Sequence, residues 1–317
     1  MPSALTTLIV LLGIVGLAFT IFWVRALAAG AKERGEGVAP TPYQLLVGFV
    51  TDFLDTLGIG SFATTTTLYR ARKTIDDRLL PGTLNVGHTL PTIVQAFIFT
   101  QVVEVEIKTL VLMIVAAVAG SLFGAPIVAR WPRRPIQIGM GCALLILCGV
   151  LVFRQLSDPA SFDTPVLRDI ATFVRDHIGS TQGGNAIGLT GGKLAIGVAG
   201  NFVLGALMTI GVGLYAPCLV LVAMLGMNPV TGFPIMMSSC AFLMPSASVP
   251  FVRNQCYSPR AALGLTIAGI PAVLIANYAI TAPPLYWVKW LVAVVVIYTA
   301  VMLLRAAARE RAASVKT

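Results

Sequence analysis

Two aspartates stand inside an otherwise apolar stretch, as Asp52 and Asp55 of residues 51–67, which read TDFLDTLGIGSFATTTT. Because they are three positions apart, they share one face of a helix. A carboxylate at the centre of a bilayer costs roughly 2.5 to 3.5 kcal/mol to insert, so such residues face water or a partner and mark ion pathways. We expect Asp55 to couple transport to a proton or cation. We expect Asp52 to support this coupling from nearer the mouth of the pathway, as a vestibule residue or helix-capping partner.

The glycines after these aspartates predict a broken helix. Gly58 and Gly60 allow a sharp turn and a close approach of the backbone to a ligand. A half-helix over about residues 42–57 would end at this turn, and a second would begin after Gly60 with unpaired backbone N–H groups. Helix N-termini bind anions through such groups. We therefore predict an anion site at the break, with contributions from Thr56, Gly58, Gly60, Ser61, Thr64 and Thr65.

More polar residues lie in apolar stretches further along the chain. Asn85 and His88 share a helix face within residues 83–102 and are candidates for the same site. His88 is either a hydrogen-bonded core residue or a proton acceptor, since histidine titrates in the physiological range. Ser238 and Ser239 either contact the anion or bond to carbonyl groups of their own helix.

The composition is that of an integral membrane protein. Of the 317 residues, 57% are hydrophobic and 11% are charged, and the mean hydropathy is +0.87, which is too apolar for a soluble domain of this size. The lipid bilayer is therefore an expected partner. Seven apolar stretches approach the ~20 residues that a spanning helix needs, near 4–24, 83–102, 109–129, 135–153, 231–250, 261–281 and 285–304.

Several classes of protein are disfavoured. The formal charge is +9, but the basic residues cluster in short loops between the apolar stretches, where membrane topology explains them, so we expect no nucleic-acid partner. The five cysteines show no CxxC spacing, and no P-loop motif is present. We therefore expect no metal, no cofactor and no enzymatic activity.

An internal repeat relates the two halves of the chain. Residues 48–64, GFVTDFLDTLGIGSFAT, align without a gap with residues 201–217, NFVLGALMTIGVGLYAP, and seven of the seventeen positions are identical at an offset of 153. Pro81 and Pro234 pair at the same offset. Apolar composition alone rarely keeps glycines, a threonine and a proline in register, so we interpret the match as a duplication. The second copy adds Thr209, Gly211 and Gly213 to the predicted anion site.

Loop charges predict how the two copies enter the membrane, because Lys and Arg in short loops favour the cytoplasm. If each glycine segment crossed once, the basic residues outside the long central loop would divide ten to eight between the two sides. If each segment is a hairpin that returns to the side it entered, the division is sixteen to two. Residues 41–69 are also too few for two full crossings. We therefore expect two re-entrant hairpins, in repeats that are inverted as in many secondary transporters.

This topology predicts an all-α polytopic membrane protein with about seven transmembrane helices plus two re-entrant broken-helix hairpins in two inverted repeats. The N-terminus is expected outside and the C-terminus in the cytoplasm. The expected segments are an N-terminal transmembrane helix and cytoplasmic loop (1–40), a hairpin plus three helices (41–154), an extracytoplasmic loop with an amphipathic helix (155–192), a second hairpin plus three helices (193–305) and a cytoplasmic tail (306–317).

The motifs GFVTDFLDTLGIGSFA and DDRLLPGTLNVGHTLPTIVQA, with the weaker second copy NFVLGALMTIGVG, resemble the TauE/SafE family of sulfite and organosulfonate exporters. The resemblance covers roughly residues 41–305. It implies a multi-pass protein of the bacterial inner membrane that moves sulfite or a related inorganic or organic sulfur anion, chiefly outward. The glycine-rich loop of the family is reduced here to Gly58-Ile59-Gly60, and two acidic residues precede it. The identity of the anion therefore stays open.

The expected function is proton-coupled secondary transport of a small oxyanion, and two other classes stay open. A passive anion channel would use the same anion site without coupling. An intramembrane hydrolase would use the two aspartates, because paired carboxyls share a proton when held close. Both aspartates, however, lie on one short helix, and the second copy has Gly205 and Met208 at their positions. The direction of net transport and the oligomeric state are also open.

Overall fold

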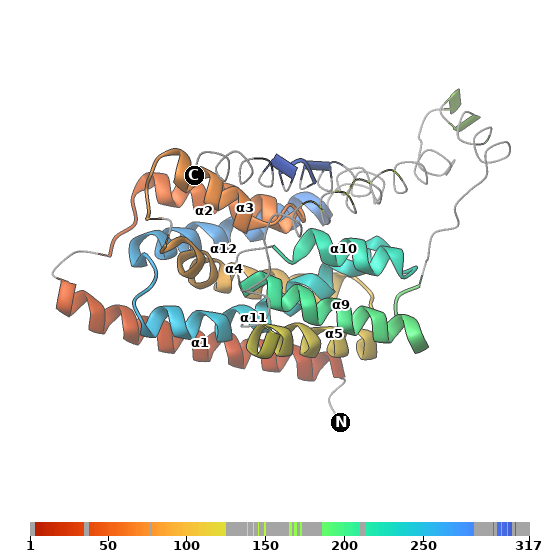
Figure 1. Cartoon of the computed structure of the whole chain (residues 1–317), viewed down its shortest axis with the longest axis horizontal. Helices are drawn as coiled ribbons and strands as arrows, with labels where there is room; N and C mark the ends of the chain where they lie inside the picture. Colours follow the sequence, from red (N-terminus) through yellow and green to blue (C-terminus); the bar gives the residue numbers. More distant parts are fainter. Residues whose placement is uncertain are drawn as a thin grey trace.

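The protein is an all-helical bundle. The computed structural model describes residues 4–34, 38–76, 78–124, 186–209 and 213–281 continuously, with isolated positions between 138 and 172 and between 294 and 308. Within these residues there is no strand, and the only β-type pairing is an isolated bridge between Ala186 and Met227. Figure 1 shows the helices running along the bundle, with α1 (Ala4–Arg34) at one edge and the short helices α2 (Pro42–Thr56) and α3 (Ser61–Ala71) at the opposite edge.

Several helices are long and apolar enough to cross a membrane, which is compatible with a multi-pass membrane protein. Within the described residues there are four: Ala4–Ala29 of α1, α9 (Gly191–Thr209), α11 (Gly232–Arg253) and Pro259–Tyr278 of α12 (Pro259–Thr281). Large apolar side chains on the outer faces of α1 and α12 are exposed, as expected of surfaces that meet lipid: Val10, Leu11, Ile14, Leu17, Ile267, Leu274 and Ile275.

The predicted spans agree in part with these helices. The spans 4–24, 231–250 and 261–281 coincide with α1, α11 and α12. The span 83–102 forms α4 (Leu80–Val102), which has 23 residues but is too polar to count among the four. Most of its polar side chains are buried in the protein, with Gln101 in the last turn exposed, so burial in the bundle replaces apolar composition.

Other predicted segments are seen only in part. The span 109–129 begins as α5 (Ile107–Ala119) and continues in a π-helical turn at Gly120–Gly124. The spans 135–153 and 285–304, the amphipathic helix of the 155–192 loop and the tail 306–317 lie outside the described residues, apart from isolated helical positions.

Helix α9 differs from the prediction. Its residues were expected to contain only the first arm of the second hairpin, but α9 has 19 residues, compared with 15 in α2. At 1.5 Å per residue it is about 28 Å long, close to the hydrocarbon thickness of a bilayer. It begins at Gly191, two residues before the predicted start of the second hairpin at 193, so the start agrees with the prediction and the length differs from that of α2.

The helix break predicted at the first glycine pair is confirmed. Helix α2 ends at Thr56, α3 begins at Ser61, and the residues between them form a turn. Gly58 and Gly60 have φ angles of 93° and 84°, in the left-handed region that favours glycine. A capping box at Thr41 starts α2, because Thr41 accepts from the Gln44 amide and the Gln44 side chain accepts from the Thr41 amide.

Helix α3 returns to the end of the bundle at which α2 begins. The Tyr43 hydroxyl, in the first turn of α2, donates to the carbonyl of Leu68 at 2.7 Å in the last turn of α3. The Arg72 guanidinium lies 4.3 Å from the centre of the Tyr43 ring, a cation–π contact that holds the same two ends together. The two short helices therefore form a hairpin with its tip inside the bundle.

The turns that follow α3 and α10 (Tyr215–Met224) match at the offset of 153. The Thr74 amide donates to Tyr69 O at 3.0 Å, and the Met227 amide donates to Val222 O at 3.0 Å. Lys73 and Gly226, which also pair at this offset, both have positive φ angles, of 49° and 92°. The sequence repeat therefore has a counterpart in backbone conformation.

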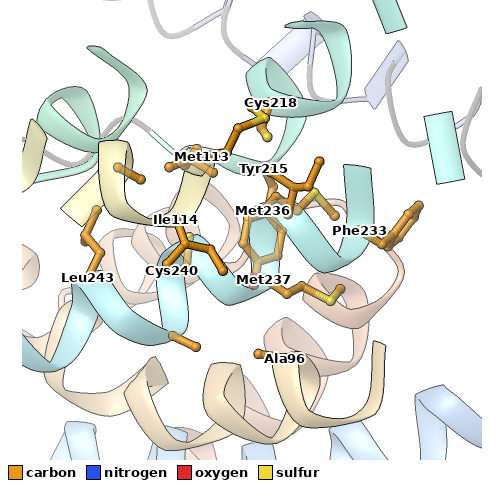
Figure 2. Close-up of a cluster of buried hydrophobic side chains, with 14 of the residues drawn as sticks. Ala96, Met113, Ile114, Tyr215, Cys218, Phe233, Met236, Met237, Cys240 and Leu243 are labelled. Atoms are coloured by element: carbon orange, nitrogen blue, oxygen red, sulfur yellow. The ribbon is translucent and has the colours of Figure 1, made fainter. Parts of the chain in front are cut away.

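The outer helices of each half of the chain pack against helices of the other half. Helices α4 and α11 contact each other in the middle of the bundle, while α2 packs on α12 and α9 packs on α5 and the π-turn. Glycines bring these outer pairs close: a Cβ at Gly48 would meet the backbone of Gly264, and a Cβ at Gly205 would meet the backbone of Ala117. A buried cluster of sulfur-containing and aliphatic side chains fills the space between α4, α5, α10 and α11 (Figure 2).

The close approach of α2 and α12 yields a stability prediction. In Gly48→Ala the new Cβ would lie 2.6 Å from Gly264 O and 2.7 Å from Leu265 Cα, and these backbone atoms cannot move without displacing α12. We expect a loss of about 1–3 kcal/mol, typical of overpacking. The midpoint of thermal unfolding of the purified protein in detergent should fall accordingly. Gly13→Ala, which meets nothing within 4 Å, is the control, and equal midpoints for the two variants would contradict the prediction.

Candidate functional site

A small cavity lies between the glycine turn after α2, here called the first break, and the non-helical residues Gly213 and Leu214 before α10, here called the second break. Counted as the space open to the centre of a water molecule, its volume is about 20 Å³, which is room for about one water. Its wall combines four residues around the first break, four around the second and one each from α4 and α11: Asp55, Gly60, Ser61, Phe62, Met208, Gly213, Leu214, Tyr215, Thr92 and Met244.

The cavity is built from equivalent positions of the two copies. At the offset of 153, Gly60 corresponds to Gly213, and the remaining wall residues of the breaks correspond as Asp55 to Met208, Ser61 to Leu214 and Phe62 to Tyr215. The first copy contributes a carboxylate and a hydroxyl where the second contributes a thioether and an aliphatic chain. One wall is therefore polar and the opposite wall is largely apolar.

The side chain of Asp55, in the last turn of α2, reaches the start of α3. Its Oδ1 accepts a hydrogen bond from the Ser61 backbone N–H at 2.5 Å, and its Oδ2 accepts one from Gln95 Nε2 at 3.0 Å. The side chain is 2% exposed. Gly60, the N-cap residue of α3, has no side chain to cap the helix, so the carboxylate takes this role. The Ser61 N–H, which was expected to be unpaired, therefore already donates to an oxyanion of the chain itself, the Asp55 carboxylate.

Gln95 connects the two halves through this carboxylate. Its Nε2 also lies 3.1 Å from Thr56 Oγ1, and its Oε1 accepts from the Tyr215 hydroxyl at 2.8 Å. Helix α2, helix α4 and the start of α10 thus share one buried hydrogen-bond network. All four side chains are buried, so each bond replaces water that the bundle excludes.

A second network surrounds Asp52. His88 Nδ1 lies 2.8 Å from Asp52 Oδ1, and His88 Nε2 lies 3.0 Å from Thr65 Oγ1. All three side chains are 0% exposed. Asp52 is therefore not in an open vestibule, because α12 closes over it at Gly269, where a Cβ would overlap with Asp52 Oδ2. This second carboxylate oxygen is buried without a hydrogen-bond partner.

The two aspartates have different partners although they share one helix face. Asp52 bonds to His88, whereas Asp55 bonds to Ser61 and Gln95. The structure thus brings nine of the predicted site residues together. Four of them line the cavity: Asp55, Gly60, Ser61 and Gly213. Four others belong to the two hydrogen-bond networks: Asp52, Thr56, Thr65 and His88. The ninth, Gly58, forms the turn beside the Phe233 ring.

Other predicted residues bond locally. The hydroxyls of Thr64 and Thr209 donate to carbonyls of their own helices, and Asn85 Nδ2 donates to Pro81 O at 2.9 Å. These three side chains therefore bond to carbonyls of the preceding turn and not to one another. Asn85 Oδ1 stays without a partner.

The remaining predictions concern the second copy. Ser239 accepts from Asn201 Nδ2 at 3.0 Å, and the Ser238 hydroxyl is buried without a partner; neither residue lines the cavity. Gly211 lies outside the described residues.

Sequence reasoning missed several residues of the site. Gln95 lies seven positions after His88, on the same face of α4, so helical periodicity could have indicated it. Tyr215 and Met208 could have been found from their pairing with Phe62 and Asp55 at the offset of 153. No local pattern marks Thr92 or Met244.

The chemistry available at the site is that of oxyanion binding and proton transfer. Within the described residues, no group of three or more His, Cys, Asp or Glu side chains is placed to hold a metal ion. The cavity combines a helix N-terminus, hydroxyl groups and a carboxylate with the His88 pair close by. No protein-family model, curated protein or solved structure matches the chain, so function has to be argued from this geometry.

The Gln95 network yields a second stability prediction. Gln95→Leu removes the bonds to Asp55, Thr56 and Tyr215 and leaves a buried carboxylate oxygen without that donor. We expect a loss of about 1–3 kcal/mol, measured as a lower unfolding midpoint in detergent. Gln101→Leu on the same helix is the matched control, because Gln101 is exposed and bonds only to Phe97 O. A Gln95 variant as stable as the Gln101 variant would show that the network does not stabilise the bundle.

Proposed function

We propose that the protein is a secondary transporter that moves a small oxyanion across a membrane through the cavity between the two helix breaks. The observation that carries the proposal is the hydrogen bond from the Ser61 N–H to the Asp55 carboxylate. An oxyanion held at a helix N-terminus inside an apolar bundle supports the same binding mode for a transported anion. No buried Lys or Arg is needed for such binding.

Competition for this N–H supplies proton coupling. A substrate anion and an ionised Asp55 would both claim the start of α3, and two negative charges 4 Å apart repel by about 4 kcal/mol at an effective dielectric constant of 20. A proton on Asp55 removes this repulsion and releases Ser61. Anion binding therefore favours protonated Asp55, so that one proton accompanies each anion bound.

Inverted repeats would supply alternating access. The cavity is bounded by equivalent residues of both copies, and the turns after α3 and α10 match at the offset of 153. The exchanged contacts of α2 with α12 and of α9 with α5 are those expected if a pseudo-twofold axis relates the copies. With room for about one water, the cavity is too small for an oxyanion in this conformation, so rocking of one copy against the other would have to enlarge it.

Basic residues support an orientation. The starts of α2, α4 and α12 lie at one end of the bundle, because Arg260 Nε bonds to Ala39 O and the Ser258 amide bonds to Thr83 Oγ1. This basic end carries Arg25, Arg70, Arg72, Lys73, Arg78, Arg253 and Arg260.

Within the continuously described residues, two basic side chains lie away from the basic end. They are Lys108 and Lys193, at the starts of α5 and α9. The positive-inside rule therefore assigns the basic end to the cytoplasm. The first hairpin would then be re-entrant from the cytoplasm, with the N-terminus outside. The resemblance to TauE/SafE exporters supports the bacterial inner membrane as the location and sulfite or an organosulfonate as the anion.

The coupling role of Asp55 predicts the behaviour of Asp55→Asn. An amide is neutral at every pH, so this variant resembles protonated Asp55 and cannot carry the proton. In proteoliposomes we expect sulfite accumulation driven by a pH difference to be abolished, while the folded state is retained.

Asp76→Asn is the control for Asp55→Asn, because Asp76 is exposed and bonds only to the backbone N–H of Arg78. Sulfite, sulfate, thiosulfate and sulfoacetate should be compared in the unaltered protein to identify the anion. Unchanged pH-driven sulfite flux in Asp55→Asn would remove Asp55 from the mechanism.

The re-entrant hairpin predicts that both of its ends face the same side. Single cysteines at Ala39 and Ala71, which are both exposed, should react with a membrane-impermeant thiol reagent from the cytoplasmic side only. The background should lack Cys142 and Cys256, which are exposed thiols. Labelling of the two positions from opposite sides of intact cells would contradict the hairpin.

A further inference from the structure

Buried hydroxyl groups line one face of α3 from the cavity to the basic end. Ser61, Thr65 and Tyr69 follow one another at intervals of four residues, so they stand in a row along the helix. Their side chains are 4%, 0% and 0% exposed. Ser61 lines the cavity, whereas Tyr69 lies in the last turn, next to the exposed residues Arg70, Arg72 and Lys73.

The Asp52–His88 pair flanks the middle of this row. Thr65 bonds to His88, which bonds to Asp52, and the Tyr69 hydroxyl interacts electrostatically with Asp52. Asp52 Oδ2 and the Tyr69 hydroxyl are both buried without a hydrogen-bond partner, so each has capacity to accept a further hydrogen bond or a proton. Together the row and the pair form a polar seam between α2, α3 and α4.

The charged and titratable groups around this seam are few. Asp52 and Asp55 of α2 act electrostatically on His88, and Asp52 and Tyr43 of α2 act on Tyr69 of α3. Helix α12 contributes Gly269 at the Asp52 carboxylate and no titratable group there. The seam therefore has a histidine and a carboxylate as its only proton-exchanging pair between the cavity and Tyr69, among the described residues.

The second copy has no such seam. At the offset of 153, Ser61, Thr65 and Tyr69 become Leu214, Cys218 and Val222 of α10, and Asp52 becomes Gly205. Leu214, Cys218 and Val222 are 1%, 0% and 0% exposed and belong to the apolar core. Figure 2 shows Cys218 within this buried cluster, beside Tyr215. A polar route to the cavity is therefore present in one copy and filled with apolar atoms in the other.

We propose that this seam is a one-sided proton path, through which Asp55 exchanges protons with the basic end and not with the opposite end. The inference rests on the proposed function, since it specifies how the coupling proton reaches the site. A proton enters at Tyr69, passes to the Asp52–His88 pair and then along Thr65 to the cavity. It ends on an Asp55 carboxylate oxygen, which then releases the Ser61 N–H.

Each step of the path conserves atoms and charge. A hydroxyl that accepts a proton on its oxygen donates its own proton to the next acceptor and returns to its neutral form. His88 accepts at one ring nitrogen and donates from the other, which its two hydrogen bonds, to Asp52 and to Thr65, already prepare. No oxidant, reductant or metal ion takes part.

Protonation of Asp55 can be followed without any substrate. Inside-out and right-side-out vesicles containing the protein are acidified rapidly on the outer side, and the infrared band of a protonated carboxyl is recorded. Assignment of this band to Asp55 comes from its loss in Asp55→Asn. We expect the band to rise quickly when the basic end is acidified and at least about tenfold more slowly when the opposite end is acidified.

Variants of the seam test the path itself. Thr65→Val and Tyr69→Phe remove one hydroxyl each with little change in shape, and each should slow the rise from the basic end by about tenfold or more. Thr65→Ser keeps the hydroxyl and should restore a fast rise. Cys218→Val, the equivalent substitution in the second copy, should leave the rate within about twofold, and the infrared amide band of every variant checks that it is folded.

Two results would overturn the path: equal rates from both ends, or equal effects of Thr65→Val and Cys218→Val. Neither depends on transport, so the path and the proposed function can fail separately. If the unaltered protein moves none of the four sulfur anions, the proposed function fails, while the infrared rates still decide whether the seam conducts protons. If transport is proton-coupled but the seam variants are as fast as the unaltered protein, the path alone is wrong.

Discussion

A carboxylate inside an apolar bundle has to find its hydrogen-bond partners within the protein, and this requirement organises the first half of the structure. Asp55 finds a backbone N–H at the start of α3, which is available only because α2 stops at the glycine turn. Asp52 finds His88, which requires α4 to lie against the same face of α2. The glycine break, the position of α4 and the buried amide of Gln95 therefore together satisfy two ionisable side chains that the bundle buries.

Close helix packing determines which copy can accept a carboxylate. Gly269 of α12 leaves space for Asp52, because a side chain there would overlap with its Oδ2. In the second copy the glycine lies on the other helix of the pair. Gly205 of α9 stands at the position of the aspartate, and the backbone of Ala117 in α5 occupies the space that a side chain would need. The Asp52 carboxylate therefore fills the contact between α2 and α12, whereas the equivalent contact, between α9 and α5, is a direct approach of the two backbones.

Local patterns predicted the break at Gly58 and Gly60, most of the helix positions and the placement of Asp55 beside the break, because each depends on neighbours within a few residues. They did not predict that Asp55 would cap α3 itself, since that bond depends on the conformation of the turn and not on residue types alone. The bond between Tyr215 and Gln95 joins residues 120 positions apart, so only the packed structure reveals it.

The asymmetry between the copies is itself a functional argument. A pair of identical copies would offer the cavity two equivalent walls and two equivalent routes for protons, and protons could then leak across the membrane without an anion. In this chain the polar wall and the polar seam lie in one copy, while Met208, Leu214 and Cys218 fill the equivalent positions of the other with apolar atoms. Apolar packing raises the cost of moving a bare proton through that half, because an unsolvated charge has no partner there. In the proposed transporter, duplication would provide the alternating scaffold, and the loss of symmetry in the side chains would allow it to couple one ion to another.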